Sequence, residues 1–61
     1  MSPELVAIWA AISAETARAT GMQAKNMQRL VLGESMAYDE QDFNYIAAAL
    51  DRLSVQARNA Q

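Results

Sequence analysis

Few residues of this 61-residue chain can do chemistry, because it contains neither cysteine nor histidine. It therefore cannot form a disulfide, a zinc-finger ligand set, a thiol nucleophile or an imidazole base. The carboxylates of Asp39, Glu40 and Asp42 are close together in sequence, but no glycine-centred loop with a glutamate at its twelfth position follows them, as a calcium loop requires. We expect these carboxylates to cap a helix, and we expect no enzyme, no metal site and no cofactor.

The net charge of −2 is unevenly distributed along the chain. Residues 1–33 carry a charge of +1, with basic side chains at Arg18, Lys25 and Arg29, whereas residues 34–61 carry −3. A polyanionic partner would therefore meet the first half of the chain.

The length and composition predict one small domain, residues 1–61, with a thin core. Hydrophobic residues make up 52% of the chain, but many of them are alanine. At this size, apolar burial barely offsets the entropy lost on folding, so a partner chain is expected. No apolar run reaches the roughly 18 residues of a membrane span, and no basic segment of a signal peptide is found at the start. We expect a cytoplasmic protein with no membrane partner.

The elements that position the polar residues are predicted to be helices only, since the chain is rich in alanine and has little β-branched alternation. Ser2 and Pro3 are typical of a helix start, and Gly21 and Gly33 are typical of helix ends. Asp39 can cap the last helix, and the apolar residues of that helix are spaced so that they lie on one face. These signals predict helices over about 3–11, 13–20, 23–32 and 39–58. The stripe of the last helix comprises Phe43, Ile46, Ala47, Leu50, Leu53 and Ala57.

The spacing between Ser13 and Leu32 resembles the helix-turn-helix of the phage repressor and Cro family, also called lambda-repressor-like or XRE. Ala17 lies four positions before Gly21, as that family's turn requires. Met22, Met27 and Leu30 follow the glycine at the family's core positions, although Thr16 and Thr20 stand where Leu, Ile or Val is usual. The resemblance implies an all-α domain of four to five helices.

The resemblance also implies a sequence-specific transcriptional regulator that binds double-stranded DNA as a homodimer. The second helix of the unit would lie in the major groove, where Arg29 can bind guanine, Gln23 or Gln28 can bind adenine, and Ala24 can contact a thymine methyl. Lys25 and Asn26 would contact a base or a phosphate, and Ser13 would lie near the DNA backbone. The implied DNA-binding residues are Ser13, Gln23, Ala24, Lys25, Asn26, Gln28 and Arg29.

Two other hypotheses remain open. The first is a protein-interaction module, such as a phage- or antitoxin-like inhibitor, on the same scaffold. The second is a helical hairpin in which residues 3–32 form one helix that packs on 39–58 and dimerises into a four-helix bundle. Its seam on the first helix would pass through Leu5, Ile8, Ile12, Thr16, Ala19, Gln23, Met27 and Leu30. For the homodimer we expect an interface of Trp9, Tyr45, Ala49, Arg52 and Val55.

Overall fold

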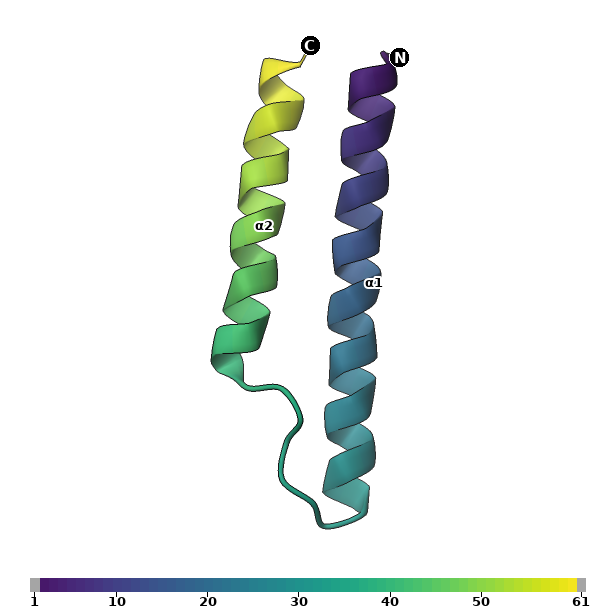
Figure 1. Ribbon diagram of the computed structural model, residues 1–61, viewed down its shortest axis with the longest axis vertical. Helices are drawn as coiled ribbons and strands as arrows, with labels where there is room; N and C mark the ends of the chain where they lie inside the picture. Colours follow the sequence, from purple (N-terminus) through teal and green to yellow (C-terminus); the bar gives the residue numbers. More distant parts are fainter. Residues whose placement is uncertain (1, 61) are drawn as a thin grey trace.

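The computed structural model describes residues 2–60 as a hairpin of two antiparallel helices (Figure 1). Helix α1 spans Pro3–Val31 and helix α2 spans Glu40–Asn59, with a loop between them. Both ends of the chain lie at the same end of the hairpin (Figure 1). The overall extents are 47 × 18 × 8 Å, so the molecule is a flat rod. The prediction of an all-α fold is confirmed for the part of the chain that the structure describes.

The prediction of four to five helices is wrong, because the segments predicted over about 3–11, 13–20 and 23–32 lie in the single 29-residue helix α1 and its cap. Gly21 is an exposed residue inside this helix, and the turn that the family resemblance implies is absent. A glycine inside a helix costs only about 1 kcal/mol relative to alanine. Ending one helix and starting another would leave up to about eight backbone groups without intrahelical partners.

Both helix starts and the end of α1 carry the capping residues that the sequence predicts. The Ser2 hydroxyl accepts a hydrogen bond from the Leu5 amide at 3.1 Å. Asp39 and Asp42 form a reciprocal capping box at the start of α2, since each side chain accepts from the other's backbone amide. At the end of α1, Gly33 takes a positive φ of 75°, which glycine adopts without a Cβ penalty. These three signals fix where each helix begins and where α1 ends.

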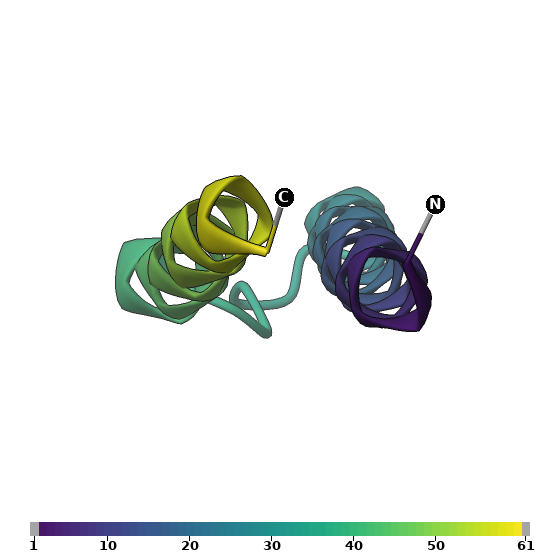
Figure 2. The same ribbon diagram turned by 90° about the horizontal axis from the view of Figure 1, so that it is seen from above.

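The contact between the helices is a heptad seam with only three buried side chains among the described residues: Ile8, Met22 and Ile46. Half-buried residues on both helices recur at alternating spacings of about three and four, as in helices that pack side by side (Figure 2). On α1 the seam comprises Leu5, Ile8, Ile12, Glu15, Ala19, Met22, Asn26 and Arg29. On α2 it comprises Phe43, Ile46, Leu50, Leu53 and Ala57, and the half-buried cap residue Ala60 follows them.

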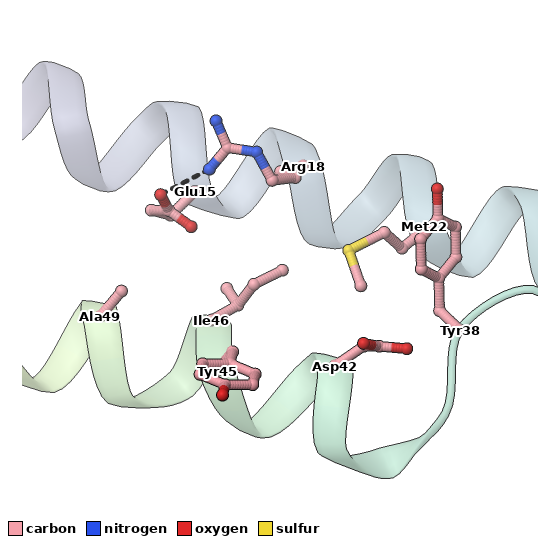
Figure 3. A pocket seen from close by; sticks show the side chains of 8 residues that line it. All are labelled: Glu15, Arg18, Met22, Tyr38, Asp42, Tyr45, Ile46 and Ala49. Carbon is pink, nitrogen blue, oxygen red and sulfur yellow. Dashed lines mark hydrogen bonds and ion pairs between the residues drawn. The ribbon is translucent and has the colours of Figure 1, made fainter.

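This seam corrects two details of the sequence analysis. Ala47 is exposed, although the rest of the predicted α2 stripe faces α1. On α1, the seam predicted for the hairpin is right at Leu5, Ile8, Ile12 and Ala19 and wrong at Thr16, Gln23, Met27 and Leu30, which are all exposed. At these four positions the observed seam residue is the one that precedes the predicted residue in the sequence. Where the α1 seam residue is small, α2 supplies the large side chain. Ile46 points toward α1 between Arg18 and Met22 (Figure 3), a stretch in which the α1 seam residue is the small Ala19.

Candidate functional site

The second regular feature of α1 is a row of exposed residues that repeats at the same heptad spacing as the seam. We call it the uncharged stripe, and it comprises Val6, Trp9, Ser13, Thr16, Thr20, Gln23, Met27 and Leu30. Each member follows a seam residue by one position, so the stripe is turned by about 100° around α1 from the contact with α2. The stripe extends over 25 of the helix's 29 residues without one charged side chain.

The charged residues of α1 lie on another side of the helix. Arg18 is nine residues from both Trp9 and Met27, which is about two and a half turns and places it opposite them. The other charged residues of α1, namely Glu4, Glu15, Lys25 and Arg29, all lie within about 60° of Arg18 on a helical projection. The two sides of α1 therefore differ completely in charge.

The large apolar side chains of the stripe are at its two ends and are open to solvent. Val6 is 53% exposed and Trp9 is 61% exposed near the start of α1, and Met27 and Leu30 are 64% and 71% exposed near its end. An isolated exposed leucine needs no explanation, but aligned large apolar residues on one helix face are typical of an interaction surface.

The middle of the stripe is small, and its threonine hydroxyls already have partners. Thr16 donates from Oγ1 to the Ile12 carbonyl at 2.9 Å, and Thr20 donates to the Thr16 carbonyl at 3.1 Å. Because these bonds are made within the helix, the two threonines can be buried without leaving a donor unpaired. The middle of the stripe can therefore lie close to another helix.

The opposite face of the hairpin carries a groove between the helices (Figure 3). Arg18 lies at this groove and forms an ion pair with Glu15, so its charge is already compensated. The acidic side chain of Asp42 and the rings of Tyr38 and Tyr45 also line the groove. With three of its eight lining side chains charged, this groove differs from the uncharged stripe.

The structure does not bring the seven predicted DNA-binding residues onto one face. Ser13 and Gln23 belong to the uncharged stripe, Lys25 lies on the charged side, and Asn26 lies in the seam. Arg29 is a half-buried seam residue at the border with the charged side. Ala24 lies beside the stripe, and Gln28 lies between the stripe and the charged side, both exposed. Their segment has no helix N-terminus of its own, because it continues from the preceding turns of α1.

Asn26 has a structural role that the sequence analysis missed. Its side-chain Nδ2 donates to the Tyr38 carbonyl at 2.8 Å. Its Oδ1 accepts from the backbone amides of Ala37 and Tyr38 at 3.0 and 2.9 Å. These three bonds tie the loop back onto α1 just before α2 begins. The amide is satisfied by the chain's own backbone, and no local sequence motif announces this contact across 12 residues.

The predicted dimer interface is divided between the two faces of the hairpin. Tyr45 and Ala49 line the groove beside Arg18, and Arg52, seven residues after Tyr45, lies on nearly the same side of α2. Trp9 lies on the uncharged stripe, opposite Arg18. Val55 is exposed on α2. No flat surface includes both Trp9 and Tyr45.

The stripe as a whole was also missed, although a signal for it exists in the sequence. Once the heptad pattern of the seam has been assigned, a second heptad pattern of uncharged residues can be seen one position later in the sequence.

Comparison of the chain with protein-family models, with curated proteins and with solved structures finds no match. Among residues 2–60, neither helix is long and apolar enough to cross a membrane.

Proposed function

We propose that the protein is a helical interaction module that binds a helix of another polypeptide chain through the uncharged stripe of α1. The observation that carries this proposal is the exposure of four large apolar side chains in line on a helix face that holds no charge. Burying such a face removes apolar surface from water at a gain of about 25 cal/mol per Å². No charged group has to be desolvated on the side of this chain.

The thin core of the hairpin supports the same proposal. Only three side chains among residues 2–60 are buried, so the chain gains little from folding alone. A second helix on the stripe would bury Trp9 and Met27, and it would double the number of helices against which α1 packs. Binding and stability are then linked, because a partner that binds only the folded hairpin stabilises it.

Site-specific photo-crosslinking in living cells tests the proposal. A photoreactive amino acid replaces Met27 in one variant and Lys25 in a matched control on the charged side of the same turn. We expect crosslinks to a polypeptide from position 27 and few or none from position 25. If both positions crosslink equally, or neither crosslinks to protein, the stripe is not a protein-binding surface.

DNA binding as a transcriptional regulator is the second candidate. The observation in its favour is that Arg18, Lys25 and Arg29 share one side of α1, where they outnumber the carboxylates of Glu4 and Glu15. Selection from a random duplex pool at about 50 mM salt tests it, because phosphate contacts are strongest at low salt. An enriched motif, with Arg29→Ala costing about 1–3 kcal/mol on that motif, would support DNA binding. No enrichment by verified folded protein would exclude it.

A further inference from the structure

We infer that the helix bound by the uncharged stripe is α1 of a second copy of this chain, packed antiparallel, so that two hairpins form a four-helix bundle. This inference rests on the proposed function and names its partner. The partner is identified by the match of the stripe to itself and by the charges that the same arrangement brings together on α2.

The stripe is symmetric in side-chain character about the level of Arg18, with large apolar residues at both ends and uncharged polar residues between them. An antiparallel copy with its two-fold axis at that level places Val6 opposite Leu30 of the other copy, and Trp9 opposite Met27. Further in, Ser13 lies opposite Gln23, and Thr16 lies opposite Thr20. Large apolar layers form both ends of the contact, the Ser13–Gln23 layers are polar, and the small Thr16–Thr20 layers lie at the centre. A two-fold axis makes such a surface self-complementary.

The central layers allow the two α1 helices to approach closely. Thr16 and Thr20 keep their hydroxyls bonded to their own helix, so their burial leaves no donor unpaired. The outer layers would bury Trp9 and Met27 against each other at both ends, an aromatic–methionine contact that is favourable in itself.

The charges on α2 favour the antiparallel arrangement over the parallel one. In the antiparallel dimer the two α2 helices also lie side by side, running in opposite directions. Glu40 and Arg58 are 18 residues apart, about five turns, and so lie on one side of α2, away from the groove that Tyr45 lines. Asp51 lies on this side too, and the antiparallel register places it opposite the uncharged Ala47 of the other copy. The antiparallel arrangement brings Glu40 at the start of one α2 toward Arg58 near the end of the other. In a parallel dimer the α2 helices would lie on opposite sides of the α1 pair, and these charges would not meet.

Cysteine crosslinking tests the register directly, because the described chain has no cysteine of its own. Val6→Cys and Leu30→Cys are made in separate chains of distinguishable mass and are oxidised alone and as a mixture. Positions 6 and 30 are about 36 Å apart along α1, and a disulfide needs Cα atoms within about 7 Å. A disulfide within one chain, or between identical positions of an antiparallel pair, is therefore impossible.

We expect the mixture to crosslink about a hundredfold faster than either variant alone, because apposition raises the effective thiol concentration from micromolar toward millimolar. Ala7→Cys mixed with Lys25→Cys is the control, since both positions lie on the charged side of α1. Rapid crosslinking of each variant with itself would overturn the inference in favour of a parallel dimer. Equal slow rates for all pairs would overturn it as well.

Sedimentation of the unmodified chain and of Thr16→Lys gives a second measurement that does not depend on the cysteine variants. We expect the mass of two chains for the unmodified protein and of one chain for Thr16→Lys, with the same helical circular dichroism. A monomer at high micromolar concentration overturns the inference. If position 27 then still photo-crosslinks to a different protein, the proposed function stands without it, whereas loss of both results removes both.

Discussion

The two helices of the hairpin differ in how many faces they use. Helix α2 has one apolar face, which runs from Phe43 to Ala57 and packs against α1 within the chain. Helix α1 has two heptad faces, the seam and the uncharged stripe, and only the seam has a partner in the chain. The apolar face of α2 is therefore covered by its own hairpin, whereas the second heptad face of α1 is exposed in residues 2–60.

The largest effect should come from Ile46 on α2, because this side chain is buried in the shared seam. We expect Ile46→Ala to lower the free energy of unfolding by about 2–5 kcal/mol, which is most of the stability of so small a chain. Val55→Ala, at an exposed position of the same helix, is the matched control and should cost well under half as much. Urea denaturation of both variants provides the measurement. Equal costs would mean that α2 has no single packed face.

How far the sequence predicts the structure also differs between the two helices. The cap at Asp39 and the stripe from Phe43 to Ala57 predict α2 almost completely, because one apolar face gives one unambiguous period. On α1, the sequence pattern predicts Met27 and Leu30 as core residues, but both are exposed on the uncharged stripe. Two heptads one residue apart produce a mixed pattern, and Gly21 then suggests a turn that the tertiary contact overrides.

The candidate site was predictable only in part, for the same reason. Trp9 was singled out as an interface residue, and it belongs to the uncharged stripe. Tyr45 was grouped with it, although the hairpin places the two on different faces. Which faces of two helices point to the same side depends on the register of the hairpin. That register is set by the seam and by Asn26, whose contacts with the loop no short-range pattern reveals.

The next largest effect is expected at Asn26. Substituting this residue tests whether its side chain holds the loop or is free to contact DNA. We expect Asn26→Ala to destabilise the hairpin by about 1–3 kcal/mol, since three hydrogen bonds to the loop are lost at roughly 0.5–1.5 kcal/mol each, partly replaced by water. Gln28→Ala, two residues later and exposed, should have little effect. Thermal unfolding measures both. Similar unfolding of the two variants would show that Asn26 does not hold the loop.

The two glycines should respond to alanine with opposite signs. Gly21→Ala should raise the unfolding free energy by about 1 kcal/mol, because the added methyl meets nothing and alanine is the better helix former. Gly33→Ala should lower it by about 1–2 kcal/mol, because alanine is strained at a φ of 75°. Melting temperatures of the two variants measure the contrast. If both substitutions are destabilising, the result would support a turn at Gly21 and therefore the helix-turn-helix hypothesis.

The smallest change in the free energy of unfolding is expected at Ala17. A change close to zero there would distinguish the hairpin from a helix-turn-helix. In a helix-turn-helix, Ala17 would lie where two helices cross, and Ala17→Leu would overpack that crossing at a cost of about 1–3 kcal/mol. In the hairpin Ala17 is exposed on α1, so we expect a change within about 0.5 kcal/mol. Ala19→Leu, two residues away in the half-buried seam, should instead show the overpacking cost. Denaturation of both variants is measured at low micromolar concentration, where self-association contributes least to stability. If Ala17→Leu is destabilising and Ala19→Leu is neutral, the face of α1 that contains Ala17, and not the seam, packs against α2.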